Sequence, residues 1–530
     1  MTIILVILAY MAVLMLLSRL TARRSTNDAF FRGERRSPWY LVAWGMIGAS
    51  ISGVTFVSVP GMVLRQDMTY MQMCLVFIPG YLLVALVLLP IYYKLNLTSI
   101  YTFLGQRLGR EAYKTGAAFF LLSKMTGAAA RFYLVCMVIW GVIVGSSGSQ
   151  EYRNSNVNYA ADSFQNHLSE LLHSCTPALQ TLSFLLVVLA MIVLIWLYTR
   201  RGGIKTLVWT DSLQTLCMFG ALLLIIYKVM GELNLDLAGV VKAIAEDSHS
   251  RVFVWDDWVS RQNFWKQFLS GVFVVIVMTG LDQDMMQKNL TCRTLRDAQK
   301  NVMTSSLLFI VVNILFLSLG AALLAYASQT GFALPVGEGG AVVADKIFPS
   351  IAFSLSGFTA VCFVLGMVAA GYSSADGTLT ALTTTFCYDF LKFDDPRDSS
   401  VTRKSSASSE TSQTRTRRVV HVGFALLYLL VIIAFRPFHT QSLIDTLFDV
   451  AGFTYGPLLG LYAFGLFTRR GVRDRAVPWI AVASPVVCYV LKLYAPQWLG
   501  YRFGFEILLL NGLITFLLLL CFPSKLKSEN

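Results

Sequence analysis

Long uninterrupted apolar runs constrain this chain more than any other feature of its sequence. Several of them, such as 301–327, exceed the roughly 20 residues that a helix needs to cross the hydrocarbon of a bilayer. Of the 530 residues, 56% are hydrophobic and 14% are charged, whereas a soluble domain carries about 25% charged residues. The sequence therefore predicts an all-α membrane protein that uses lipid as its solvent.

The apolar runs predict about 13 transmembrane helices. We place them near residues 3–20, 39–63, 68–93, 114–145, 178–198, 204–228, 264–287, 301–327, 350–390, 418–435, 441–467, 476–494 and 504–522. The first run is followed by arginines and not by a cleavage site, so we expect a retained helix with its N-terminus outside. The C-terminus is then inside, and roughly 30 Lys and Arg residues lie on the cytoplasmic side against about 11 outside. This distribution predicts a multi-pass protein of the cytoplasmic (inner) membrane.

Charge and cysteine usage exclude several other classes of protein. The formal net charge is +13, but Lys and Arg gather in the short connections between apolar runs, as anchoring to a membrane requires. No basic stripe with interleaved aromatic residues suggests a nucleic-acid partner. The nine cysteines form no CxxC pair, so we expect no transition-metal site. No nucleophile with a base and no nucleotide loop is present, and we do not expect an enzyme.

Two of the predicted helices are interrupted. The second contains three glycines, four hydroxyl residues and Pro60 between Gly48 and Gly61, and proline and glycine both weaken a helix. The seventh carries Thr279-Gly280 directly before an acidic cluster at Asp282. Two broken helices five segments apart are typical of inverted repeats with a binding site at the midplane.

We divide the chain accordingly, with one extra helix before the repeats and two after them. The N-terminal helix and a basic cytoplasmic loop occupy 1–38, the first repeat 39–228 with an external loop at 146–177, the second repeat 264–467 with a disordered cytoplasmic linker at 394–418, and the two C-terminal helices with a cytoplasmic tail 476–530. The linker is predicted from its Ser, Thr, Arg and Lys content.

A cluster of hydroxyl residues in segment 350–390 predicts a sodium site. Sodium is a hard cation that prefers neutral oxygen ligands, and Ser373 and Ser374 supply two of them, with the carbonyl of Ala370 one turn earlier. The broken helix opposite adds the bare carbonyls of Gly48 and Ile51. The competing explanation is that intramembrane hydroxyls only hydrogen-bond to neighbouring helices.

Among the ionisable residues within apolar segments we single out three, because a charge there is costly and needs a partner or a task. Asp211 and Asp376 are candidates for a second cation or proton site, and a structural hydrogen bond competes as the explanation for Asp211. Arg131 cannot lose its proton, so it either holds a substrate carboxylate or pairs with a structural acid or carbonyl. We favour the structural pairing for Arg131.

Four motifs taken together resemble the sodium/solute symporter family. They are the run 51–61, the Gly-Gly…Thr-Asp-x-x-Gln pattern at 202–214, Asp282-Gln-Asp-Met-Met-Gln-Lys288 followed by Asp297-Ala-Gln-Lys300, and Ser373-Ser-Ala-Asp376. They span Tyr40–Asp389. The resemblance implies a leucine-transporter-type fold of two inverted five-helix repeats, with sodium held by Gly48, Ile51, Ala370, Ser373 and Ser374.

The resemblance also suggests where the solute binds. Ser50, Ser52 and Thr55 fall where relatives touch substrate. Sugar-binding relatives have Glu-Gln where this chain has Val54-Thr55, and an aromatic pair where it has Met278-Thr279. Some relatives place a second sodium near the position of Asp211, with a serine where this chain has Ala370. These departures argue against a galactose-like pocket and against a second sodium here. Arg131 and Thr279 complete our predicted solute site.

The combined prediction is sodium-coupled symport of a small organic solute into the cytoplasm by alternating access. The solute is a sugar, sugar acid, amino acid or other carboxylate, and Na+ is the coupling ion. The alternatives are a proton-coupled or channel-like carrier, and a membrane sensor, which would lack an output domain. The expected partners are the solute, sodium and the bilayer, with the protein a monomer or weak homo-oligomer.

Overall fold

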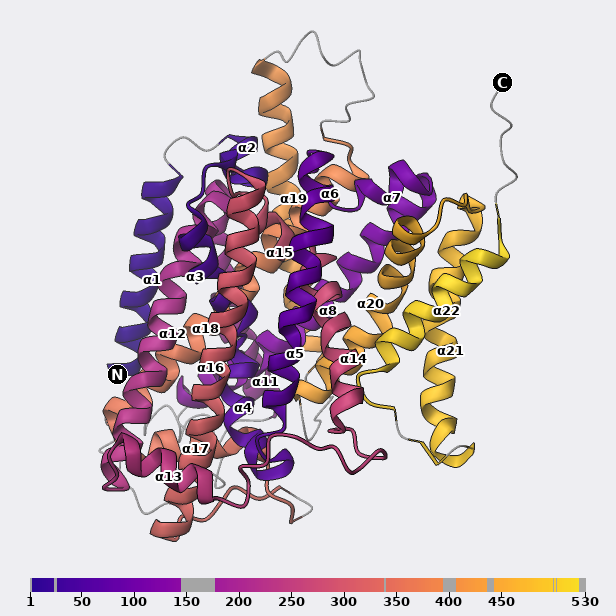
Figure 1. Ribbon diagram of the computed structural model, residues 1–530. Helices are drawn as coiled ribbons and strands as arrows, with labels where there is room; N and C mark the ends of the chain where they lie inside the picture. The colour runs from indigo at the N-terminus through magenta and orange to yellow at the C-terminus, as the bar shows by residue number, and fades with distance from the viewer. Residues whose placement is uncertain are drawn as a thin grey trace, which may run out of the picture.

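The computed structural model describes residues 2–523 apart from 23–25, 144–176, 338–339, 394–406, 436–442, 499 and 502. Every regular element in these residues is a helix, and the long helices run side by side in one bundle (Figure 1). This confirms the predicted fold class.

Ten helices of the described residues are long and apolar enough to cross a membrane. They are α1 (Thr2–Thr21), α5 (Tyr70–Leu83) continued through a π-helical turn (Val84–Leu88) into α6 (Leu89–Lys94), α8 (Arg110–Ile143), α11 (Pro177–Gly202), α12 (Ile204–Glu232), α16 (Leu295–Thr330), α18 (Gly357–Thr385), α19 (Ala407–Ala434), α20 (Leu443–Phe467) and α21 (Val477–Trp498). Two bent pairs are one span each, α3 (Trp39–Ser50) with α4 (Gly53–Gln66) and α14 (Phe264–Val275) with α15 (Gln283–Asn289). With the shorter apolar helix α22 (Ile507–Cys521), they match the 13 predicted segments in order.

Short helices fill several connections. They are α2 (Asn27–Arg32), α7 (Thr102–Arg107), α13 (Leu237–Glu246) and α17 (Ala344–Leu355), with 3-10 turns at Gly33–Arg35 and Asp474–Ala476 and π-helical turns at Ile276–Gly280 and Phe386–Phe390. The predicted segment 350–390 is thus divided, because Ser356 is extended (φ −169°, ψ 160°) and its hydroxyl caps α18 by accepting from the Thr359 N–H.

The predicted linker 394–418 is shorter than its composition suggests. Residues 394–406 lie outside the described part, and α19 begins at Ala407. Thr414 and Arg417 of this helix contact α2, where Arg417 donates to Asn27 over 2.9 Å and stacks on Phe30. Tertiary contacts therefore extend a helix through a polar segment that composition alone assigns to a loop. The predicted external loop lies outside the described residues up to 176.

Both interrupted helices are broken where the sequence predicts it. Between α3 and α4 the axis bends by 63°, and Ile51 and Ser52 have extended backbones. Between α14 and α15 it bends by 68°, and the carboxylate of Asp282 caps α15 by accepting from the N–H groups of Asp284 and Met285. Two breaks of similar angle, five segments apart, fit the predicted inverted repeats.

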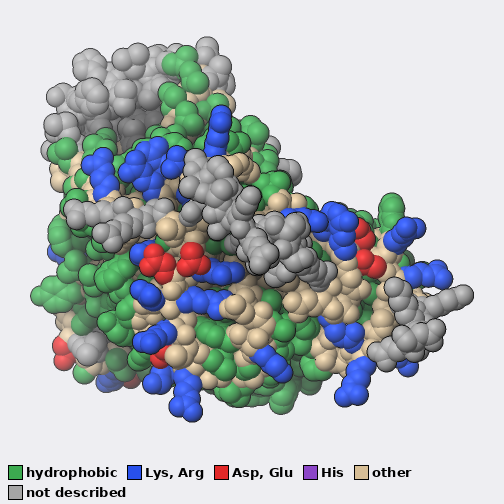
Figure 2. Space-filling view, turned by 90° about the horizontal axis from the view of Figure 1, so that it is seen from above, with side chains coloured by type: hydrophobic (Ala, Val, Ile, Leu, Met, Phe, Trp, Pro, Cys, Tyr) green, Lys and Arg blue, Asp and Glu red, His purple; other side chains and the backbone are tan. Residues whose placement is uncertain are grey.

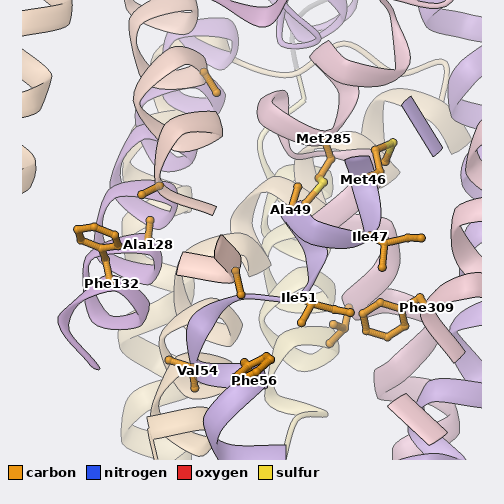
Figure 3. Close-up of a cluster of buried hydrophobic side chains, with 14 of the residues drawn as sticks. Met46, Ile47, Ala49, Ile51, Val54, Phe56, Ala128, Phe132, Met285 and Phe309 are labelled. Carbon is orange, nitrogen blue, oxygen red and sulfur yellow. The ribbon is translucent and has the colours of Figure 1, made fainter. Parts of the chain in front are cut away.

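Apolar packing surrounds the first break. Ile51, Val54 and Phe56 are buried there, and Figure 3 shows Ile51 beside Phe309, which comes from a distant part of the chain. Gly53 fits the break between α8 and α18, because a Cβ at this glycine would overlap Cγ2 of Val135 on α8 and would lie 3.6 Å from Gly371 Cα on α18. The break is therefore held in a fixed position against α18.

Candidate sodium and solute sites

The predicted sodium ligands converge where the end of α3 meets α18. A Cβ built on Gly48 would lie 3.4 Å from the hydroxyl of Ser373, so the two helices are in contact at this level. Ala370 and Ser373 are fully buried on the same stretch of α18. The carbonyl of Gly48 lies in the last turn of α3, and that of Ile51 lies in the break itself. The last carbonyls of a helix have no N–H partner within the helix, so they can accept from another group or bind a cation. Neutral oxygens in this arrangement fit a sodium ion.

Asp211 on α12 lies directly behind the paired serines. The hydroxyl of Ser373 donates to Oδ1 of Asp211 over 3.0 Å, and the ammonium of Lys288 on α15 lies 2.9 Å from Oδ2. A serine that donates its proton to a carboxylate turns its lone pairs away from that carboxylate, so Ser373 is oriented to receive a cation. Asp211 already has a cationic partner.

A cavity adjoins the break and collects every predicted solute residue. Ser50, Ser52, Thr55, Arg131 and Thr279 all line it, and the sodium-site residue Ser374 lines it too. Its volume of about 140 Å³ is roughly ten times the minimum that a cavity needs to hold one water molecule. Ala49, Val54, Met285 and Phe309 form part of its apolar wall (Figure 3). The cavity suits a small organic molecule with a polar and an apolar side.

Arg131 is the charged group of the cavity without an ionic partner among the described residues. Its Nε donates to the carbonyl of Gly127 over 3.0 Å, one turn earlier on α8. This contact agrees with the carbonyl pairing that we favoured from the sequence, but it uses only one of the five N–H donors of a guanidinium. The other donors remain for a ligand in the cavity.

A buried group of ion pairs beside the cavity was not predicted. Lys124 of α8 lies 3.2 Å from Asp282 and 2.8 Å from Asp284, and Lys288 lies 3.5 Å from Asp284. Lys124 and Asp282 also line the cavity. A signal existed, since Lys124 lies inside the apolar segment 114–145, seven residues or about two helical turns before Arg131.

Asp376 lies on α18 and forms no direct ion pair with these lysines. Its Oδ2 accepts hydrogen bonds from the hydroxyl of Tyr198 (2.7 Å) and the amide of Gln214 (3.5 Å). Its Oδ1 is buried without a hydrogen-bond partner, and no Lys or Arg of the described residues lies within 4.0 Å of the carboxyl. The structure therefore separates the two predicted candidates for a second cation or proton, since Asp211 is paired and Asp376 is not.

Comparisons with known proteins agree with this architecture. The chain is 22% identical over 493 residues to the sodium/sialic acid symporter NanT of Aliivibrio fischeri, covering 91% of this chain and 86% of that protein. It is 23% identical over 459 residues to the sodium/iodide cotransporter of Homo sapiens, covering 84% and 62%. A solved structure of a Na+-coupled sialic acid symporter, substrate-bound and outward-open, matches with a TM-score of 0.76 at 18% identity over 99% of both chains. That structure shows the same fold.

The sequence profile of the sodium:solute symporter family matches residues 178–476. This stretch begins with α11 and ends at the start of α21, and it includes Asp211, the α15 acids and the paired serines of α18. With more than half of its length matched, the chain belongs to the sodium:solute symporter family and is a sodium-coupled secondary transporter rather than an enzyme.

Proposed function

We propose that this symporter carries a small organic carboxylate into the cytoplasm together with sodium. Arg131 carries the proposal, because it reaches the cavity with free donors and no carboxylate of the described residues pairs with it. A guanidinium in a low-dielectric site favours an anion that can accept two parallel hydrogen bonds. Relatives named as sodium/sialic acid symporters support this class of solute, since sialic acid bears a carboxylate.

In this proposal one sodium binds the carbonyls of Gly48, Ile51 and Ala370 and the hydroxyls of Ser373 and Ser374. Ser374 lines the cavity as well, so the ion completes the wall of the solute site. Ser50, Ser52, Thr55 and Thr279 supply neutral hydrogen-bonding groups for the remainder of the solute. Sodium couples to the solute because it favours the conformation in which both sites are formed.

The sodium gradient is sufficient for accumulation. One cation that crosses about 100 mV releases roughly 2.3 kcal/mol. A tenfold concentration ratio adds about 1.4 kcal/mol, and the total corresponds to about 500-fold accumulation of the solute at one-to-one stoichiometry.

We propose an orientation in the cytoplasmic (inner) membrane with the N-terminus outside and the C-terminus inside. Figure 2 looks down on the end of the bundle where α2, α6 and α7 lie, and many Lys and Arg side chains stand on this face. Basic residues concentrate on the cytoplasmic side of membrane proteins. That end of the bundle is therefore the cytoplasmic one in this proposal.

A second candidate function is proton-assisted transport, and the lone carboxyl of Asp376 favours it. A buried carboxylate without a direct ion pair is costly, whereas a protonated carboxyl is neutral and can donate a hydrogen bond. Asp376 is thus a proton site or a second cation site in this alternative, while Asp211 is balanced by Lys288.

Uptake into proteoliposomes tests the main proposal. Sialic acid is the first solute to measure, followed by smaller carboxylates and their amides, with an inward sodium gradient or with choline in its place. We expect uptake of a carboxylate that requires sodium, and a loss of at least about tenfold in Arg131→Gln with a smaller loss in Arg131→Lys. Equal uptake in choline would exclude sodium coupling. A preference for neutral amides, or unchanged uptake in Arg131→Gln, would exclude the carboxylate.

A further inference from the structure

Five buried charged side chains form an unbroken series between the solute cavity and the sodium site. In order they are Asp282, Lys124, Asp284, Lys288 and Asp211, and we call them the charge series. Carboxylates and ammonium groups alternate along it, no gap exceeds 3.5 Å, and each side chain is at most 6% exposed. Its members come from α8, α12 and α15, so only the tertiary structure brings them together.

Each end of the charge series touches one of the two proposed sites. At the cavity end, Asp282 lines the cavity and also accepts from the hydroxyl of Tyr455, another lining residue, over 2.8 Å. At the other end, Asp211 accepts from the hydroxyl of Ser373. Asp284, in the middle, neither lines the cavity nor contacts the paired serines through a hydrogen bond.

Both ammonium groups lie between two carboxylates and nearer to the one on the sodium side. Lys288 is 2.9 Å from Asp211 and 3.5 Å from Asp284. Lys124 is 2.8 Å from Asp284 and 3.2 Å from Asp282. Each ammonium can therefore shift toward its cavity-side partner without losing an ionic contact. Such shifts are energetically significant because water does not screen buried charges.

We propose that the charge series relays the occupancy of the sodium site to the solute cavity. A cation that binds at Ser373 attracts the carboxylate of Asp211 and repels the ammonium of Lys288, which shifts toward Asp284. Asp284 then attracts Lys124 less strongly, and the ammonium of Lys124 shifts toward Asp282. Positive charge thereby moves nearer the cavity, and an anion beside Arg131 is bound more tightly. The inference rests on the proposed function and adds a physical route for coupling, in which Lys124, Asp284 and Lys288 are positioning residues.

A cycle of variants tests the relay with sodium alone as the ligand. Sodium affinity is measured on the purified full chain from the rise in melting temperature with NaCl, with choline chloride keeping the ionic strength constant. Asp282→Asn keeps the cap of α15 but leaves Asp284 as the ionic partner of Lys124. Lys124 then moves closer to Asp284, and this shift pushes the ammonium of Lys288 toward Asp211. We expect sodium affinity to fall about fivefold in this variant, within the usual range of coupling between sites.

Asp284→Asn interrupts the charge series while each lysine keeps one ionic partner. When Asp284→Asn is already present, we expect Asp282→Asn to change sodium affinity by less than about twofold. If a relay connects the two residues, the effects of the two substitutions on sodium affinity are not additive. Asp282→Asn could instead lower sodium affinity equally with and without Asp284→Asn. Direct attraction between Asp282 and the sodium ion would then account for the effect, and the relay would be overturned. If sodium does not stabilise the parent protein at all, the proposed sodium site fails instead, and the two failures are thus distinguishable.

Gly377→Ala provides a version of the test without a change of charge. A Cβ at Gly377 would lie 2.5 Å from Oδ1 of Asp284, so alanine displaces this carboxylate from its place between the lysines. In the Gly377→Ala background, as in the Asp284→Asn background, we expect Asp282→Asn to leave sodium affinity nearly unchanged. Gly220→Ala on α12 is the matched control, because nothing lies within 4 Å of a Cβ there. If Asp282→Asn also had no effect on sodium affinity in the Gly220→Ala background, the relay would be overturned. If Asp284→Asn does not fold, the Gly377→Ala variant tests the relay in its place.

Discussion

The backbone N–H of Gly48 donates to the hydroxyl of Thr215 over 3.1 Å, which ties the end of α3 to α12 at the level of the proposed sodium site. The contact leaves no space for a side chain, because a Cβ at Gly48 would overlap Oγ1 of Thr215. The same Cβ would lie 3.4 Å from Ser373 Oγ. The position of the Gly48 carbonyl therefore depends on the absence of a side chain at this residue.

Gly48→Ala should weaken sodium binding. We expect the last turn of α3 to move away from α12 and the sodium concentration for half-maximal uptake to rise at least about fivefold, a loss of about 1 kcal/mol. Thr215→Ala, introduced together with Gly48→Ala, removes the overlapping hydroxyl and should recover part of the affinity. Gly220→Ala serves as the control, and an unchanged sodium dependence in Gly48→Ala would contradict the site.

Ser374→Ala should abolish sodium-dependent uptake. The serine is a proposed sodium ligand that also lines the cavity, and its loss removes one of only five oxygens from the ion. Uptake in sodium should fall to the level measured in choline. Ser354→Ala on α17 is a fair comparison, because Ser354 hydrogen-bonds only within its own helix. Sodium stimulation that persists in Ser374→Ala would remove this serine from the site.

Asp376→Asn should separate sodium coupling from proton assistance. If Asp376 holds a proton, asparagine resembles the neutral carboxyl, and uptake should continue while its dependence on external pH disappears. Uptake is measured from mildly acidic to mildly alkaline pH at fixed sodium. Asp474→Asn is the comparison, because both oxygens of Asp474 accept hydrogen bonds from backbone N–H groups, those of Glu111 and Ala112. A pH profile in Asp376→Asn that equals that of the parent would exclude a proton at this carboxyl.

Asn511→Ala should lower stability without a direct effect on sodium binding. The Asn511 side chain of α22 is fully buried against α20 and α21. It accepts from Ser484 of α21 and donates to the carbonyls of Gly452 and Phe453 of α20. Loss of these hydrogen bonds leaves buried partners unsatisfied and costs about 1–3 kcal/mol. Thermal melting in detergent should show a lower midpoint than the parent, while the half-saturating sodium concentration stays the same. An unchanged midpoint would show that these contacts contribute little.

The sequence by itself determined the membrane-spanning class and the two broken helices. Apolar runs of sufficient length must form helices in lipid, because no water is available to hydrogen-bond their backbones. Gly48 and Gly53 act locally, so the interruption near Ile51 is visible without any tertiary contact, whereas α4 continues through Pro60. The serine pair at 373–374 and Arg131 are conspicuous for the same reason, since polar groups in apolar runs are costly.

Only the tertiary structure decided which charges meet. Lys124, Asp284 and Asp211 lie on three different helices. No periodicity within one helix can show that Lys288 faces Asp211, while no Lys or Arg of the described residues lies within 4.0 Å of the Asp376 carboxyl. Composition likewise assigned 407–418 to a loop, although contacts with α2 extend α19 through it. Helix formation in lipid follows from each segment alone, whereas pairing of buried charges depends on how the segments pack against one another.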